Sequence, residues 1–269
     1  MGSEPGRTAA EVRRALRELR YLLTGLQLGG LADWPGSAER IAHNPAVENP
    51  TSGGPISLGA SPLEAEDPGV APAPDGEAIP KEDPGELLSE VRTEMGDCRR
   101  CRLHSARKQI VFGDGSPRAR LVFVGEGPGF EEDQQGRPFV GRAGKLLDKM
   151  IRSIGLERED TYICNVVKCR PPGNRTPAQD EMEVCSAFLF RQLKIIAPRV
   201  VCALGSCASQ TLLGKQKSIS LLRGKRHLWH GVSLVCTYHP AYLLRNPAQK
   251  AAVWEDLLEI RSILDANAP

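Results

Sequence analysis

The sequence has 269 residues, of which 41% are hydrophobic, and a net charge of +2. It contains no run of about 18 or more apolar residues, which a membrane-spanning helix requires. No apolar stretch follows the charges near the N-terminus, so no secretory signal is expected, and eight cysteines are too sparse for a disulfide scaffold. We therefore expect a cytoplasmic protein whose cysteines bind metal, act in catalysis or lie buried as thiols.

The charge is distributed unevenly along the chain. Residues 1–29 carry a net charge of +2, residues 30–85 a net charge of −8 and residues 86–269 a net charge of +8. A basic part behind an acidic segment favours a polyanionic partner, although a solvated surface rich in Lys and Arg would have the same composition.

Two segments precede the part that is predicted to be globular. Within residues 1–29, one valine and five leucines recur near helical spacing with arginines between them, which predicts an amphipathic helical segment. Residues 30–85 hold ten of the 21 prolines and few large apolar residues. Such a composition cannot bury enough apolar surface to offset chain entropy, so we predict an acidic, disordered linker.

From residue 86 onward, short apolar runs alternate with helical patterns. The predicted strands are 119–125, 161–167, 199–205 and 232–238, and the predicted helices are 141–154, 177–196, 206–213 and 248–264, with Thr176 as the cap before Pro177. Strands that are almost entirely apolar are typical of a parallel sheet covered on both faces. The predicted fold is α/β: a three-layer α/β/α domain with a central four-stranded parallel sheet.

Polar residues gather where the predicted strands end. Ligands of such sheets bind outside the carboxyl ends of the strands. The residues there are Gly125-Glu126-Gly127, Asn165, Gly205-Ser206 and Tyr238-His239-Pro240. A polar set converging on one rim is stronger evidence for a site than any single residue.

The eight cysteines divide into two groups. Cys164, Cys202, Cys207 and Cys236 lie in or beside apolar strands and are predicted to be core thiols. Cys98 and Cys101 form a C-x2-C pair, and Cys169 and Cys185 form a C-x15-C pair, all in polar, basic surroundings that favour thiolate ligands. Four thiolates suit zinc or an iron–sulfur cluster, and the spacing alone does not decide between them.

Three further residues stand out near the predicted rim. The segment 125–147 lacks the spacing of a phosphate-binding or dinucleotide-binding loop, which leaves a glycine-rich turn and an exposed Phe139. Asn165 interrupts an apolar strand and either caps a turn or pairs with a nucleobase edge. His239 ends the fourth strand, where histidine is as often structural as functional.

Several motifs occur together in one order and spacing. They are C-x2-C at 98–101, VFGDG at 111–115, VGEGPG at 124–129, GRPFVGRAG at 136–144, NVVKCRPPGNR at 165–175, Cys185, the ALG of the third strand, RGK at 223–225 and HPAYLLRNP at 239–247. On these motifs, residues 98–264 closely resemble the family 4, iron–sulfur uracil-DNA glycosylases. Ala241 departs from the serine that is frequent in the family. The first 85 residues carry no resemblance.

The resemblance implies a cofactor and a uracil pocket. Cys98, Cys101, Cys169 and Cys185 would hold a [4Fe-4S] cluster. Gly125, Glu126 and Gly127 would form the turn of the pocket, Phe139 would stack on uracil, and Asn165 would read its O4/N3 edge. His239 would stabilise charge on O2, with Glu126 as the second catalytic candidate. Gly127 stands where related glycosylases have a water-positioning aspartate, so Glu126 or Glu132 would take that role, unless stabilisation of the leaving group dominates.

The implied function is monofunctional uracil excision from single- or double-stranded DNA, which initiates base excision repair. The uracil must leave the base stack. Leu243 is placed to wedge into the vacated space, and Arg170, Arg175 and Arg245 are candidates for phosphate contacts. We expect a monomer, with a protein partner for the N-terminal helix.

Two alternatives belong to other classes. One is a non-catalytic or covalent binder of uracil-DNA, but the loop 170–178 has neither the histidine nor the insertion of such a relative. The other is an electron-transfer iron–sulfur protein, which would not need Phe139, Asn165 and His239 on a rim away from the cysteines.

Overall fold

The computed structural model describes residues 83–266. The predicted segment 1–29 and residues 30–82 of the predicted linker lie outside the described residues. Helix α2 (Pro84–Met95) begins two residues before the predicted boundary at 86. Its start is set by Asp83, whose side chain accepts a hydrogen bond from the Gly85 amide at 3.1 Å, and by Pro84 in the first turn.

The sheet has six strands in the order β1-β3-β2-β4-β6-β5. Its centre consists of four parallel strands, β3 (Tyr162–Asn165), β2 (Leu121–Gly125), β4 (Val200–Leu204) and β6 (Val232–Thr237). These are the four predicted strands. The prediction of only four was wrong because β1 (Asp114–Gly115) and β5 (Arg226–Trp229) add antiparallel edges. The sequence pattern of these two strands is weak, because β1 has only two residues and three of the four β5 residues are not buried.

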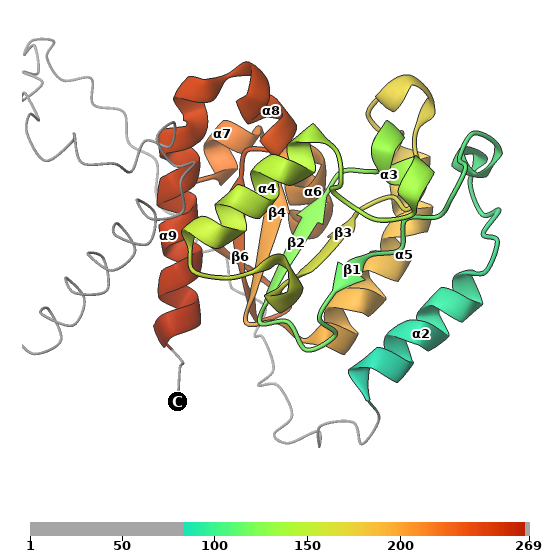
Figure 1. Ribbon diagram of the computed structural model, residues 1–269, viewed down its shortest axis with the longest axis horizontal. Helices are drawn as coiled ribbons and strands as arrows, with labels where there is room; N and C mark the ends of the chain where they lie inside the picture. Colours follow the sequence, from blue (N-terminus) through green and yellow to red (C-terminus); the bar gives the residue numbers. More distant parts are fainter. Residues whose placement is uncertain (1–82, 267–269) are drawn as a thin grey trace, which may run out of the picture. The chain divides into compact units, whose positions relative to one another are not determined.

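Helices cover both faces of the sheet, as predicted (Figure 1). One face packs against α2, α5 (Gln179–Ile196), α6 (Gly205–Leu213) and α7 (Ile219–Leu222). The other packs against α4 (Arg142–Ser153), α8 (Pro240–Arg245) and α9 (Lys250–Ala266). Shorter elements complete the described chain: η1 (Arg102–Ser105), α3 (Phe130–Gln135), η2 (Arg158–Asp160), η3 (Pro172–Asn174) and η4 (Pro247–Gln249).

Helix α5 begins later than predicted. Ala178 is its N-cap residue, and Thr176 makes no capping bond, because residues 177 and 178 are still outside the helix. The Ala178 amide instead donates to Glu181 Oε2 at 2.8 Å, so the carboxylate satisfies an end of the helix that the threonine was predicted to cap.

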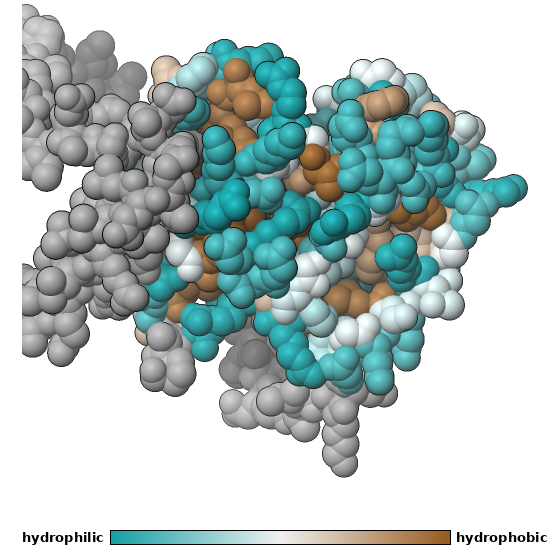
Figure 2. All heavy atoms as spheres, viewed as in Figure 1, coloured by the Kyte–Doolittle hydropathy of each residue, from teal (hydrophilic) through white to brown (hydrophobic). Residues whose placement is uncertain are grey.

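The four cysteines assigned to the core lie there. Cys164, Cys202 and Cys236 are fully buried, and Cys207 is 7% exposed. Hydrophilic residues dominate the face of the molecule seen in Figure 2, with hydrophobic residues in smaller patches. Among residues 83–266, no helix combines the length and the apolar character needed to cross a membrane.

Candidate active site

A pocket of about 500 Å³ opens at the carboxyl ends of β2, β3 and β6. Five of the residues predicted to act on the ligand line it, namely Glu126, Gly127, Phe139, Asn165 and His239. They lie far apart in the sequence and meet because parallel strands end at the same edge of the sheet. Gly205 and Ser206, also predicted at the rim, are not among the lining residues; Gly205 packs against His239.

Gly125, the last residue of β2, packs closely against two of these side chains. A methyl group added at its Cα would lie 2.4 Å from Asn165 Oδ1 and 2.6 Å from Phe139 Cζ. Only glycine therefore lets the amide and the ring approach the end of β2 this closely.

The Phe139 loop is held in an uncommon backbone conformation. Phe139 has a φ of 51°, and its carbonyl accepts a hydrogen bond from Arg158 Nη1 at 3.1 Å. Gly144 is needed beside it, because a Cβ there would lie 1.9 Å from the Phe139 carbonyl oxygen. The prediction that Phe139 is exposed was wrong: the residue is 6% exposed, and its ring centroid lies 5.5 Å from that of His239. Several contacts thus fix this ring in the wall of the pocket.

Asn165 presents an unsatisfied acceptor. The residue is 1% exposed, and its Oδ1 atom is buried with no hydrogen-bond partner among the described residues. A buried polar atom without a partner costs about 1–3 kcal/mol. A ligand with an N–H group at this position would remove that cost.

His239 is neutral and has a defined tautomer. It caps α8, and its Nδ1 accepts a hydrogen bond from the Ala241 amide at 3.1 Å. Burial, with a smaller effect from the positive charge of Arg245, lowers the pKa of His239 to about 4. The proton therefore sits on Nε2, which can donate to a ligand. Because Ala241 contributes its backbone, the alanine in place of the family's serine leaves this bond intact.

The two glutamates at the pocket have different environments. Glu132 accepts backbone hydrogen bonds from Gly129 at 3.1 Å, Val140 at 2.8 Å and Gly141 at 2.9 Å, so it orders the loops. Glu126 makes no such contact within residues 83–266, and burial raises the pKa of its carboxyl group. Of the two carboxyl groups, Glu132 is therefore engaged by the loops, and Glu126 is not engaged by them among residues 83–266.

Three predicted phosphate-contacting arginines differ in placement. Arg175 and Arg245 line the pocket, and Arg245 is exposed. Arg170 does not line it; its Nε donates to Asn174 Oδ1 at 2.7 Å, and its guanidinium lies 5.1 Å from the centre of the exposed Phe130 ring. All three are at or next to the mouth of the pocket.

The prediction that Leu243 is a wedge is wrong. Its side chain is fully buried on the inner side of α8, within the core between α4 and the sheet. The sequence position does not reveal this, because it depends on which face of the short helix packs inward. Leu244, the next residue, is 40% exposed.

The four cysteines predicted as ligands line one small cavity together. Cys98 and Cys101 precede η1, Cys169 follows β3, and Cys185 lies in α5. No three His, Cys, Asp or Glu side chains between residues 83 and 266 are arranged to hold a single metal ion. The thiols nevertheless come from three separate segments and face one space.

Nitrogen donors surround these sulfur atoms. Arg100 Nη1 lies 3.4 Å from Cys98 Sγ, Arg107 Nη1 lies 3.4 Å from Cys169 Sγ, and the Lys168 amide donates to Cys185 Sγ at 3.3 Å. The expected lowering of thiol pKa is outweighed by burial, which raises the pKa of Cys169 to about 11 despite Arg107. Donors of this kind are the outer contacts that orient metal-bound thiolates.

Several residues that shape the site were not singled out in the sequence. Arg158 holds the Phe139 loop, and Lys168 donates from Nζ to the Asn165 carbonyl at 2.8 Å. Glu181 is fully buried and pairs with Arg175 at 2.7 Å. Their partners lie from 3 to 79 positions away along the chain, so the sequence around each residue does not indicate what it contacts.

Known proteins resemble this chain over about two thirds of its length. Residues 112–258 match the family model of the uracil DNA glycosylase superfamily. The chain is 48% identical over 183 residues to the Type-4 uracil-DNA glycosylase of Thermotoga maritima, a match covering 66% of this chain and 95% of that protein. Proteins of the same name from Sulfurisphaera tokodaii and Archaeoglobus fulgidus are 43% and 42% identical, over 65% and 68% of this chain and 84% and 96% of theirs.

Proposed function

The chain belongs to the uracil-DNA glycosylase superfamily, and we propose that it hydrolyses the N-glycosidic bond of uracil in DNA. The products are free uracil and an abasic site, which begins base excision repair. One observation carries the proposal: a pocket that joins an aromatic ring, an unsatisfied amide and a neutral histidine.

Asn165 and Phe139 recognise the base. Uracil offers a donor at N3 and an acceptor at O4, which complement the Oδ1 and Nδ2 atoms of an asparagine amide. Cytosine presents the reverse pattern at these two positions. The Phe139 ring packs against the base, and the base must first leave the DNA stack, at a cost of a few kcal/mol.

His239 and Glu126 act as the bond breaks. The C1′–N1 bond breaks with its electrons going to uracil, whose growing charge on O2 is stabilised by the Nε2 proton of His239. Water adds to C1′ and gives a proton to the Glu126 carboxylate, while uracil is protonated from solvent. The neutral imidazole can fill this role because its Nδ1 accepts from the Ala241 amide, which leaves the proton on Nε2.

Positive side chains hold the DNA across the pocket. Arg175 and Arg245 are the phosphate contacts at the pocket itself, and Arg170 extends the surface beside it. These contacts do not depend on base sequence, so both single- and double-stranded DNA are proposed as substrates. We expect a monomer acting in the cytoplasm, with residues 1–29 available to a protein partner.

Cys98, Cys101, Cys169 and Cys185 are proposed to hold a [4Fe-4S] cluster. Four thiols from three segments around one cavity, with N–H donors at three of the sulfurs, fit such a group. When bound, the cluster cross-links the η1 loop, the end of β3 and α5. Hydrolysis uses the residues of the pocket alone. Metal analysis of protein purified without oxygen tests this proposal: about four irons per chain are expected, and stoichiometric zinc would contradict it.

Uracil release from short oligonucleotides tests the proposed activity. We expect turnover on uracil-containing single and double strands, and none on matched thymine-containing controls. Asn165→Asp should lose uracil excision and weaken discrimination against cytosine, because the carboxylate removes the Nδ2 donor. A stable complex with DNA that releases no more than one uracil per protein chain would instead support the binding-protein alternative.

A further inference from the structure

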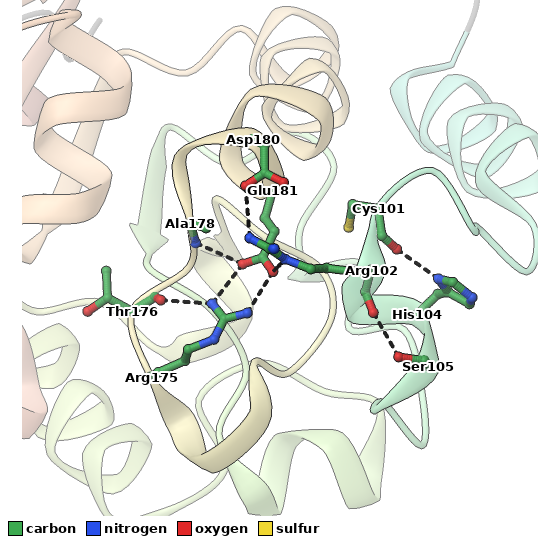
Figure 3. Close-up of polar contacts among 9 residues, drawn as sticks. All are labelled: Cys101, Arg102, His104, Ser105, Arg175, Thr176, Ala178, Asp180 and Glu181. Carbon is green, nitrogen blue, oxygen red and sulfur yellow. Dashed lines mark hydrogen bonds and ion pairs between the residues drawn. The ribbon is translucent and has the colours of Figure 1, made fainter.

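We infer that Glu181 and Arg102 are positioning residues that orient Arg175 for contact with DNA. The inference rests on the proposed function. It links the loop that carries Cys101 to the substrate pocket through one buried carboxylate. Figure 3 shows this group of side chains, with both arginines directed at Glu181.

Glu181 holds Arg175 through two parallel bonds. Arg175 Nη1 donates to Oε2 at 2.8 Å and Nη2 donates to Oε1 at 2.7 Å. A two-bond pair fixes the plane of the guanidinium as well as its position. Hydrogen bonds from Arg175, the Ala178 amide and Arg102 together lower the pKa of Glu181 to about 2, so the carboxylate is ionised at neutral pH.

Arg102 ties the same carboxylate to the cysteine loop. It directly follows Cys101, and its Nε donates to Glu181 Oε1 at 2.7 Å while its Nη2 contacts Asp180 at 3.1 Å. Cys185 lies one helical turn beyond Glu181 on α5. The carboxylate therefore joins two segments that carry cysteines to the loop that carries Arg175.

Arg175 still has donors to offer. An arginine has five N–H groups, and here three are used, two by Glu181 and one by the Thr176 carbonyl at 3.0 Å. Within residues 83–266, its Nε–H and one Nη2–H have no acceptor. The side chain is 41% exposed and lines the pocket. A DNA phosphate at the pocket mouth is the acceptor that these donors suit.

The charges indicate positioning rather than long-range attraction. Arg102, Arg175, Asp180 and Glu181 sum to zero formal charge, so the group adds little to the field of the basic surface. Its contribution lies in geometry, because a guanidinium that is already oriented loses less freedom when it binds a phosphate.

A double-mutant cycle on DNA binding tests this inference. The probe is a labelled single-stranded oligonucleotide with one uracil on a cleavage-resistant 2′-fluoro sugar, and anisotropy gives the Kd across a salt series. Arg175→Gln should weaken binding about five-fold and reduce the slope of log K against log salt by about 0.7. Arg102→Gln should weaken binding about three-fold in the wild-type background and not at all in the Arg175→Gln background.

Arg99→Gln is the matched control. Arg99 lies in the same cysteine loop, is 74% exposed and pairs with Asp97 rather than with Glu181. Arg99→Gln therefore removes the same positive charge as Arg102→Gln but leaves the contacts of Glu181 unchanged. Equal effects of Arg99→Gln and Arg102→Gln, or additive effects of Arg102→Gln and Arg175→Gln, would overturn the inference.

Two further measurements keep the test decisive. Circular dichroism checks that Arg102→Gln folds, as expected for a side chain that is 61% exposed; if it does not, Glu181→Gln combined with Arg175→Gln gives the same cycle. Because binding is measured without cleavage, a wild-type protein that releases no uracil would refute the proposed function while the cycle still tests the positioning of Arg175.

Discussion

Gly125→Ala is the most direct test of how the pocket is built. The glycine ends β2, and the conformation of its backbone is open to alanine, so any effect comes from the added methyl group. That group would meet Asn165 Oδ1 at 2.4 Å and Phe139 Cζ at 2.6 Å. Both side chains proposed to hold uracil would have to move at once.

The size of the effect follows from these two distances. Carbon contacts are normally about 3.5 Å or longer, so each side chain must shift by about 1 Å. The strand cannot move away instead, because β2 is paired on both sides, with β3 and β4. A displacement of about 1 Å at reacting groups costs roughly 100-fold in rate, and overpacking costs about 1–3 kcal/mol of stability.

Single-turnover release of uracil is the assay, with thermal unfolding as the check on stability. We expect the single-turnover rate constant to fall about 100-fold. Gly214→Ala is the control, because its added methyl group meets nothing within 4 Å, although a φ of +62° makes alanine unfavourable there. It should lose stability and keep its rate. If Gly125→Ala excised uracil at the wild-type rate, Asn165 and Phe139 would not form the base pocket.

Five further outcomes are expected. His239→Ala should slow single-turnover excision about 100- to 1000-fold while binding of uracil-DNA at fixed salt changes little; equal losses of binding and rate would make the histidine structural. Burial raises the pKa of Glu126, so the excision rate should begin to fall, as pH is lowered, at a pH above the usual pKa of glutamate. In Glu126→Gln this acidic fall in rate should be absent. The raised pKa also means that the folded protein loses stability when Glu126 ionises as pH rises. Glu126→Gln, which cannot ionise, should therefore have a melting temperature at pH 8 no lower than that of the wild type. A lower melting temperature would contradict this. Cys98→Ala should lose bound iron, measured by metal analysis, whereas Cys202→Ala should retain it. Removing residues 1–82 should leave excision from short oligonucleotides intact, and a truncated chain that keeps iron but not activity would contradict this.

The central sheet could be predicted because its strands are buried on both faces. Each of β2, β3 and β4 consists wholly of buried residues, which in the sequence gives a short apolar run. The edge strand β5 is different, since Arg226 and Leu228 are exposed and only its last residue is buried. A strand with one neighbour and a solvated face leaves no comparable pattern.

The site was predictable where a residue acts through its own chemistry, and not where it acts through a partner. Asn165 and His239 stand at strand ends, so their place follows from the sheet. Glu181 looks like any acidic residue in the first turn of a helix, and its role depends on Arg102, 79 positions earlier. Leu243 shows the opposite error, because its type suits a wedge but its side chain is buried in the core.

The end of β3 joins the pocket to the cysteine cavity. The side chain of Asn165 lines the pocket, and its carbonyl accepts a hydrogen bond from Lys168 Nζ at 2.8 Å. Lys168 is 1% exposed, also contacts Gln192 Oε1 at 2.5 Å, and is followed directly by Cys169. Five consecutive residues thus supply the amide proposed to read the base, a buried lysine and a thiol proposed as a ligand. A change in the cavity that moved Cys169 would also displace the backbone of Asn165. The proposed cluster would therefore stabilise the pocket without taking part in hydrolysis.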